Sequence, residues 1–165
     1  MQPMTASPRP HISNERVRWA DVDLVGIMRF SAFTRLVEHA EQELSREAGM
    51  PYSEAFSSPA VWMPRRSLHI DYTAPARLDD PLALVAYVSR MGNSALTLNV
   101  DVMSADFGQL YASATVVTVC VSVSDFRKRS IPDDIRTAMG PFTMSSDEVC
   151  AWLANRSLVE EYRGV

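Results

Sequence analysis

The stretch WADVDLVGI, residues 19–27, stands directly before the strongest helical pattern of the chain. It carries two carboxylates, Asp21 and Asp23, at the end of an expected first strand, and Gly26 then permits a tight turn. In an extended strand these two acids share a face, because side chains alternate. A helix starting near Ser31 places unpaired backbone N–H groups beside them. Such groups can polarise a carbonyl while a carboxylate attacks it or activates water.

The long helix is predicted over residues 31–48. Its apolar residues recur at helical spacing and form one stripe. Ser31 is the expected N-cap, and Gly49 is expected just after the helix ends. The residues of this stripe are Phe33, Leu36, Val37, Ala40, Leu44 and Ala48.

Strand patterns lie on both sides of this helix. The alternation of apolar and polar residues is cleanest over 95–104. The other expected strands cover 11–20, 67–72, 82–91 and 110–123. Short links around Gly92 and Gly108 imply antiparallel neighbours, since parallel crossovers need a dozen or more residues. A helix is expected over 132–139, and the capping-box spacing from Ser145 to Glu148 predicts another. The sequence therefore predicts an α+β fold with the long helix packed on an antiparallel sheet.

Composition limits the possible classes of protein. The chain has 165 residues, 47% of them hydrophobic, and a net charge of -4, which argues against a general nucleic-acid binder. No apolar run is long enough for a membrane span. Cys120 and Cys150 form no metal or disulfide framework, so a reducing cytoplasm is expected. We expect a flexible arm over 1–10, one domain over 11–140 and a helical extension over 141–165.

Three sequence blocks in this order resemble the hotdog-fold acyl-CoA thioesterases of the 4-hydroxybenzoyl-CoA thioesterase type. The first block is Asp-x-Asp-x-x-Gly-Ile after Trp19, followed by Phe30, Phe33 and the helical Glu38. The second block spans Arg66–Asp80, and the third spans Asp125–Pro132. The resemblance covers residues 17–139 and implies a hotdog fold, in which an antiparallel sheet wraps around one long central helix, with extra C-terminal helices here.

The resemblance also implies roles for individual residues. Asp23 matches the family's catalytic carboxylate, which acts as a nucleophile or general base on a thioester carbonyl. Asp21 is the alternate acid and the expected support. The backbone amide of Phe30 matches the family's carbonyl-polarising donor, Gly26 permits close approach, and Glu38 occupies the second acidic position.

The resemblance implies coenzyme A as part of the substrate. The basic residues Arg66, Arg127, Lys128 and Arg129 suit its phosphates. No cofactor and no metal is expected, because the positions that would complete a calcium loop are Val25 and Ala32. A homodimer or homotetramer is implied, with the pocket at the subunit interface and no nucleic-acid or membrane partner.

Two other functions remain open from the sequence. One is release of an acyl group from a carrier protein, and the other is acyl-CoA binding without catalysis. A hydratase or dehydratase is disfavoured, because such hotdog enzymes pair an acid with a nearby histidine and no histidine lies between Asp23 and Glu38. Phe30 and Phe33 stand where some relatives carry His or Tyr, so a side-chain role at Phe30 is lost.

Overall fold

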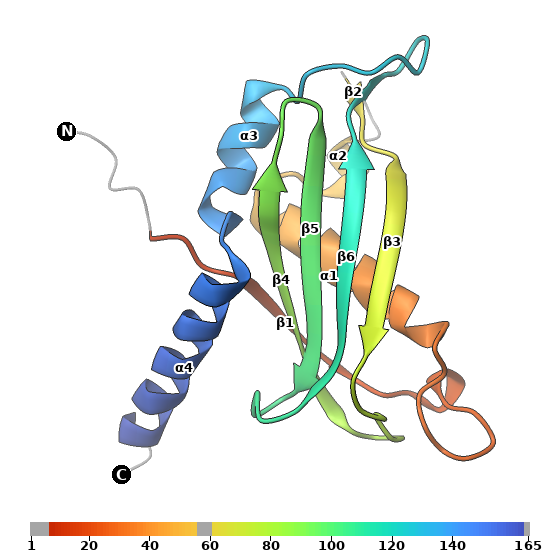
Figure 1. Cartoon of the computed structure of the whole chain (residues 1–165), viewed down its shortest axis with the longest axis vertical. Coiled ribbons are helices and arrows are strands. Elements are labelled where there is room, and N and C mark those ends of the chain that lie inside the picture. The colour runs from red at the N-terminus through yellow and green to blue at the C-terminus, as the bar shows by residue number, and fades with distance from the viewer. Residues whose placement is uncertain (1–6, 56–60, 164–165) are drawn as a thin grey trace.

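The computed structural model describes residues 7–55 and 61–163 (Figure 1). Five strands form one antiparallel sheet in the order β1-β4-β5-β6-β3. Two short strands, β2 and β7, pair beside it. The strands are β1 (His11–Arg16), β2 (Val61–Trp62), β3 (Arg65–Tyr72), β4 (Pro81–Met91), β5 (Ala95–Ser104), β6 (Leu110–Val119) and β7 (Val121–Ser122). The helices are α1 (Ala32–Glu47), α2 (Tyr52–Ala55), α3 (Asp133–Met139) and α4 (Ser146–Arg163), with 3₁₀ turns η1 (Trp19–Asp21) and η2 (Gly140–Phe142).

Helix α1 covers one face of the sheet, which we call the inner face. Its apolar stripe is buried, and Leu36 and Ala40 have no exposed surface. Alternate residues of the central strands meet it, including Leu84, Val100 and Val116. Each fully buried side chain of this size stabilises the domain by roughly 1.5–3 kcal/mol, before the loss of conformational entropy on folding is counted. This confirms the α+β arrangement expected from the two periodicities.

Helix α4 covers part of the opposite, outer face. Val85 and Tyr87 of β4 point away from α1 and pack against Met144 and Val149. As a result, β4 is buried at every position from Leu82 to Val88. The C-terminal helix therefore adds a second, smaller core to the sheet.

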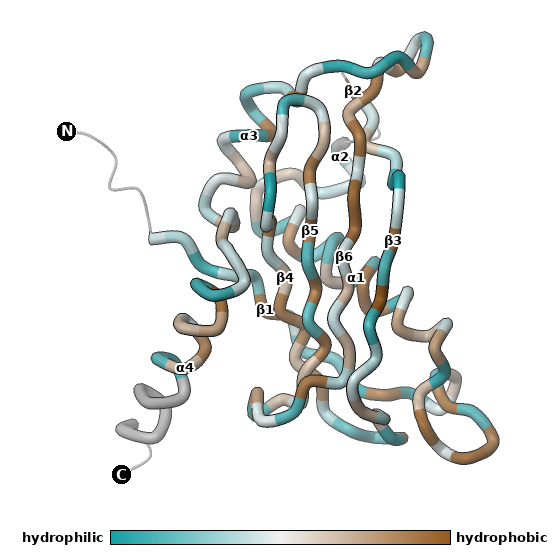
Figure 2. The backbone as a smooth tube through the Cα atoms, in the orientation of Figure 1, coloured by the Kyte–Doolittle hydropathy of each residue, from teal (hydrophilic) through white to brown (hydrophobic). Residues whose placement is uncertain are grey.

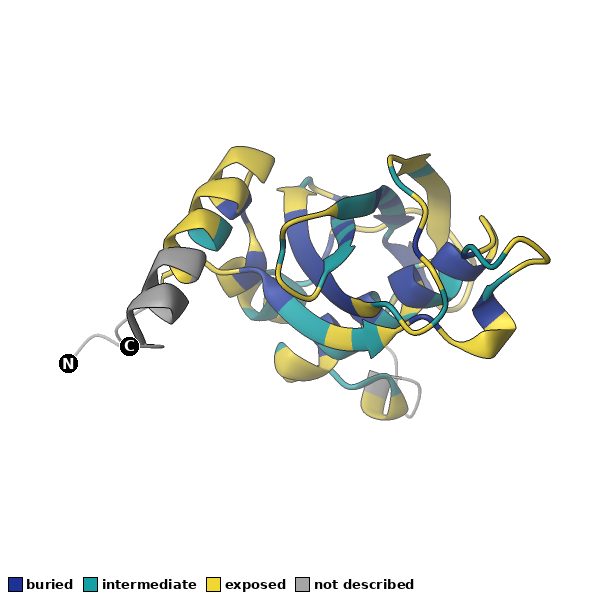
Figure 3. Ribbon diagram, turned by 90° about the horizontal axis from the view of Figure 1, so that it is seen from below, coloured by how far each residue is buried: buried dark blue, intermediate teal, exposed yellow. Residues whose placement is uncertain are grey.

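Strand β3 forms the opposite edge and has almost no cover. Seven of its eight positions are exposed, including Leu68 at 40% and Tyr72 at 50%. Figure 3 shows this contrast between the dark blue middle of the sheet and its exposed edge. Long exposed edges are unusual in proteins, because they invite pairing with another strand.

Several expected boundaries change in the structure. The first strand ends at Arg16 rather than Ala20, because the chain turns into η1. The run 110–123 is divided at Cys120 into β6 and β7. After α1, Tyr52–Ala55 forms the short helix α2, for which the sequence predicted no element, and residues 56–60 lie outside the described ranges.

The predicted helix ends are mostly confirmed. Gly49 has φ +77 after α1, and its N–H donates to the Arg46 carbonyl at 3.1 Å. Ser145 and Glu148 make the reciprocal capping bonds at the start of α4. Ser31 occupies the N-cap of α1 but makes no side-chain capping bond, since its backbone is already helical. Of the expected arm over 1–10, residues 1–6 lie outside the described ranges, and the domain boundaries stay a prediction.

Candidate active site

Asp23 lies in a tight, exposed turn between η1 and α1. Its Oδ1 accepts a hydrogen bond from the Val25 N–H at 2.9 Å, and its carbonyl accepts one from Gly26 at 3.0 Å. Gly26 has φ +77, the left-handed region in which a side chain is strained. The turn closes through the Asp23 N–H, which donates to the Ile27 carbonyl at 3.0 Å. The carboxylate is thus oriented by its own backbone and faces solvent in the single chain.

Asp21 has a different environment, which corrects the expectation that the two acids share a face. Because η1 replaces the extended strand, Asp21 turns inward and is only 4% exposed. Arg35 of α1 binds its carboxylate with both Nε at 3.1 Å and Nη2 at 2.5 Å. Burial would raise the pKa of Asp21, but the hydrogen bonds and charge of Arg35, with the Arg18 N–H, lower it below its ordinary value. Asp21 therefore anchors the turn to the helix.

Further contacts fix the segment between this turn and α1. The Met28 N–H donates to the Ala76 carbonyl at 2.8 Å, and the Arg29 N–H donates to the Asp21 carbonyl at 2.8 Å. The Tyr72 hydroxyl donates to the Phe30 carbonyl at 3.1 Å. Sequence reasoning missed Arg35 and Tyr72 as partners. Tyr72 lay within the matched block 66–80, whereas nothing in the sequence pointed to Arg35.

The Phe30 amide is placed as a hydrogen-bond donor. Its peptide unit is oriented by the Arg29 carbonyl, which accepts from the Ala32 N–H at 2.9 Å. Because a trans peptide points its N–H opposite to its C=O, the Phe30 N–H projects out of the helix N-terminus. Within the described ranges we find no protein acceptor for it. A donor at this end of a helix suits a developing negative charge.

Several large apolar side chains of the segment 19–30, which carries Asp23, are exposed in the single chain. Trp19 is 81% exposed, Val25 71% and Phe30 75%, and Leu24 has no cover at all. Figure 2 shows brown segments along this projecting loop, at the lower right of the sheet. An apolar cluster of this kind marks a binding or interaction surface.

Glu38 is exposed on α1, while its neighbour Glu41 is engaged. Glu41 accepts hydrogen bonds from the Tyr52 hydroxyl at 3.0 Å and from Arg65 Nη2 at 2.6 Å. Burial and the nearby Glu41 raise the pKa of Tyr52, and Glu38 adds to this effect. The charge of Glu38 thus acts on Tyr52 and on Arg65 at the start of β3, and no contact between Glu38 and Asp23 is found among the described residues.

The expected basic residues lie at the opposite end of β3 from Asp23. Arg66 is exposed near the start of β3, and Lys128 pairs with Val121 of β7 in an isolated bridge. The loop carrying Arg127, Lys128 and Arg129 is exposed, and among the described residues Arg127 alone of the three makes an ion pair, to Asp125 at 3.6 Å. Tyr72, which touches Phe30, ends the same strand. One chain therefore separates the acid from the basic run by the length of β3, about 25 Å at roughly 3.3 Å per residue.

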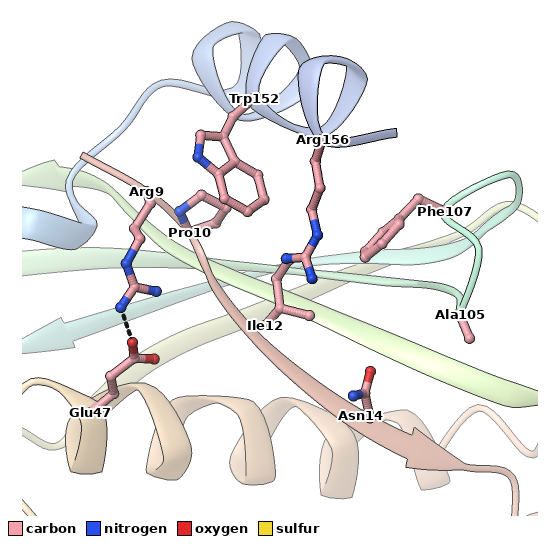
Figure 4. A pocket seen from close by; sticks show the side chains of 9 residues that line it. All are labelled: Arg9, Pro10, Ile12, Asn14, Glu47, Ala105, Phe107, Trp152 and Arg156. Atoms are coloured by element: carbon pink, nitrogen blue, oxygen red, sulfur yellow. Dashed lines mark hydrogen bonds and ion pairs between the residues drawn. The ribbon is translucent and has the colours of Figure 1, made fainter. Parts of the chain in front are cut away.

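A cavity of about 460 Å³ lies elsewhere, between α4 and the edge strand β1 (Figure 4). Arg9, Glu47, Trp152 and Arg156 are among its lining residues, and none of the predicted site residues is. Glu47 is paired there with Arg9 and His11. Across the residues that the structure describes, no three His, Cys, Asp or Glu side chains gather as a metal site. None of the described helices has both the length and the apolar character needed to cross a membrane.

Comparison with known proteins gives relatives of similar length. A 1,4-dihydroxy-2-naphthoyl-CoA hydrolase from Synechococcus is 27% identical over 137 residues, covering 80% of this chain and 90% of the relative. The acyl-CoA thioester hydrolase YbgC of Escherichia coli is 28% identical over 120 residues, covering 73% and 88%.

Solved structures share the fold. A 1,4-dihydroxy-2-naphthoyl-CoA thioesterase from Synechocystis has a TM-score of 0.74 at 21% identity, over 79% of this chain and 96% of that one. A dynemicin thioesterase has a TM-score of 0.74 at 14% identity, over 83% and 99%. These likenesses confirm the hotdog fold, while the narrower 4-hydroxybenzoyl-CoA type stays a prediction.

The family model described as the thioesterase-like superfamily matches residues 17–139, from the end of β1 to the end of α3. That match includes the Asp23 turn, α1 and the strands from β2 to β7, and it leaves out α4. The chain therefore belongs to the thioesterase-like superfamily of hotdog-fold enzymes.

Proposed function

We propose that this protein hydrolyses an acyl thioester, with acyl-CoA as its substrate, to the free acid and the thiol. The observation that carries the proposal is the contrast between the two acids of the first motif. Asp21 is buried and bound to Arg35, whereas Asp23 is exposed in the turn that precedes α1. The Phe30 amide at the start of that helix has no protein acceptor among the described residues. Relatives named as acyl-CoA hydrolases point to the same reaction.

The reaction uses few groups of the chain. The thioester carbonyl oxygen binds at the Phe30 N–H, which stabilises the negative charge that develops there. Asp23 either takes a proton from a water that attacks the carbonyl carbon or attacks that carbon itself. The C–S bond then breaks, and the thiolate leaves and takes up a proton. In the nucleophilic route, water hydrolyses the resulting anhydride and restores Asp23.

A homodimer explains how the acid and the basic run reach one substrate. The β3 edges of two copies can pair antiparallel about a twofold axis, which forms a continuous sheet. Each Asp23 end then lies beside the basic end of the other copy. We infer that the partner subunit's Arg66, Arg127, Lys128 and Arg129 hold the phosphates of coenzyme A. The exposed Leu68 and the apolar cluster around Asp23 support this arrangement. Tetramers would be built from such dimers.

We infer a cytoplasmic location, because Cys120 and Cys150 are both free thiols in the structure.

The test is thiol release from a panel of short-chain, long-chain and aromatic acyl-CoAs. Wild type should turn over at least one of them, and Asp23→Asn should lower kcat by about 10²–10⁴-fold, the usual contribution of a general base. Asp21→Asn is measured beside it, to separate loss of the Asp23 carboxylate from loss of the charge that anchors the turn to α1. Undiminished turnover by Asp23→Asn would remove Asp23 from the mechanism. Tight binding of acyl-CoA without turnover across the panel would favour the non-catalytic alternative.

A further inference from the structure

Tyr72 links the exposed edge strand to the amide that the proposed reaction uses. It is the last residue of β3, and its hydroxyl donates to the Phe30 carbonyl at 3.1 Å. Its ring meets the ring of Phe33 edge-on, with centroids 5.2 Å apart and planes at 72°. Phe33 is only 3% exposed, so this contact fixes the Tyr72 ring on a rigid part of the core.

This hydrogen bond completes the restraint of the Phe30 backbone. The peptide before Phe30 is held by the Arg29 carbonyl, which accepts from the Ala32 N–H at 2.9 Å. The peptide after it is held by the bond from Tyr72. With both flanking peptide planes fixed, neither backbone dihedral of Phe30 can rotate freely. The bond to the Arg29 carbonyl orients the peptide that carries the Phe30 N–H, and the Tyr72 bond limits how that peptide can turn relative to α1.

The second restraint on the Phe30 backbone is the single hydrogen bond from Tyr72, and the side chain of Phe30 adds little to hold the residue in place. Its side chain is 75% exposed, so packing of the ring does not hold the residue in place. The neighbouring Ser31 makes no capping bond with its side chain. Loss of the Tyr72 hydroxyl should therefore loosen the start of α1 without disturbing the core beneath it.

We propose that Tyr72 is a positioning residue for thioester hydrolysis, whose hydroxyl holds the Phe30 peptide in the orientation needed to stabilise the transition state. This inference rests on the proposed function, since it concerns the same amide. Tyr72 touches the backbone beside the donor and takes no part in proton transfer. Its removal should therefore act on kcat, because the donor acts most strongly on charge that develops in the transition state.

The test compares Tyr72→Phe with Tyr111→Phe. Tyr111 is a suitable control, because its hydroxyl bonds Asp80 at 3.5 Å on the neighbouring loop and does not touch Phe30. Thiol release is measured with the acyl-CoA that wild type hydrolyses fastest. We expect Tyr72→Phe to lower kcat about tenfold, less than the 10²–10³-fold loss of a whole oxyanion donor. KM should stay within about twofold, and Tyr111→Phe should match wild type.

Hydrogen exchange supplies a readout independent of turnover. The peptide covering residues 28–33 should exchange faster in Tyr72→Phe than in wild type or Tyr111→Phe. A kcat within twofold of wild type for Tyr72→Phe, or equal losses in both variants, would overturn the positioning role. These outcomes differ from failure of the proposed function, which would be seen as no thiol release by wild type from any acyl-CoA of the panel, whatever the hydrogen exchange of Tyr72→Phe shows.

Discussion

Strands β4 and β3 belong to the same sheet, yet their surroundings differ completely. Strand β4 is buried from Leu82 to Val88, because α1 covers its inner face and α4 covers its outer face. Strand β3 is exposed at seven of eight positions. Strand β4 belongs to the interior of the folded domain. Strand β3 forms an exposed edge with no strand paired to its outer side among the described residues, and it ends near the turn that carries Asp23.

This difference indicates that the covered side of the sheet contributes mainly to stability and the uncovered side mainly to function. The covered side of the sheet includes α4, which lies outside the family match at 17–139. The uncovered side carries Asp23, Phe30, Tyr72 and Arg66. Substitutions on the covered side should therefore act on folding, and those on the uncovered side on assembly and turnover.

The same substitution in both strands gives the largest expected contrast. Leu84→Ala removes a fully buried side chain from β4 and should lower the free energy of unfolding by about 2–5 kcal/mol. Leu68→Ala in β3 should cost less than about 1 kcal/mol in the isolated chain and should weaken dimerisation instead. Urea unfolding and sedimentation measure the two effects. Equal destabilisation by both would show that β3 is as well packed as β4.

The Asp21–Arg35 pair anchors the exposed turn to helix α1, so a substitution of Asp21 tests the junction between the exposed turn and the buried core. Asp21→Asn should cost about 1–3 kcal/mol, because it removes the nearer of the two carboxylates that pair with Arg35 and leaves Glu15 at 3.6 Å. The pKa of Asp21 is lowered in the folded chain, so its stabilisation is present above the ordinary value near 3.8 and is lost as the pH falls through the lowered value. Acid unfolding below about pH 4 should be shallower in Asp21→Asn than in wild type. Parallel curves would contradict the charge interaction.

Shortening a side chain of α4 that packs on β4 should have an intermediate effect on the free energy of unfolding. Val149 of α4 is 2% exposed and packs on Val85 and Tyr87. Val149→Ala should lower the free energy of unfolding by about 1–2 kcal/mol. Its kcat should stay at the wild-type value, since α4 contributes no residue to the Asp23 turn. A loss of kcat without a loss of stability would place α4 in the active site.

Substitution of two acids that lie in one row across the sheet should give the smallest change in stability. Asp101 of β5 and Asp71 of β3 both lie opposite Ser113 of β6. Burial raises the pKa of Asp101, although its hydrogen bond from Ser113 opposes this, whereas the Asp71 side chain is 72% exposed.

Because the ionised form of Asp101 is disfavoured in the folded chain, its contribution to stability is greatest at low pH. That contribution is lost as the pH rises through the raised value. Asp101→Asn should therefore stabilise the protein at pH 7 by up to about 1 kcal/mol, and Asp71→Asn should leave stability unchanged. Thermal unfolding of the two variants decides this. Destabilisation by Asp101→Asn would contradict the burial argument.

The sequence predicted the parts of the fold that follow from periodicity. The stripe of α1 and the alternation of β5 are strong local signals, and both elements appear as expected. The pairing of Asp21 with Arg35 had no such signal, because it joins residues 14 positions apart through the η1 turn. The same turn overturned the expectation that Asp21 and Asp23 share a face. The separation of the basic run from Asp23 is likewise a property of topology, since it depends on which ends of β3 the two loops approach.

Subunit complementation tests most directly whether two copies build each active site. One variant carries Asp23→Asn, and the other replaces Arg66, Arg127, Lys128 and Arg129 by Gln. At acyl-CoA concentrations below the wild-type KM, each variant alone should be nearly inactive. After mixing and re-association, half of the dimers combine both variants, and each of these has one site with an intact acid and an intact basic run. The account predicts recovery of roughly a quarter of wild-type activity. Activity no greater than the sum of the separate variants would show that the acid and the basic run of each site belong to the same chain.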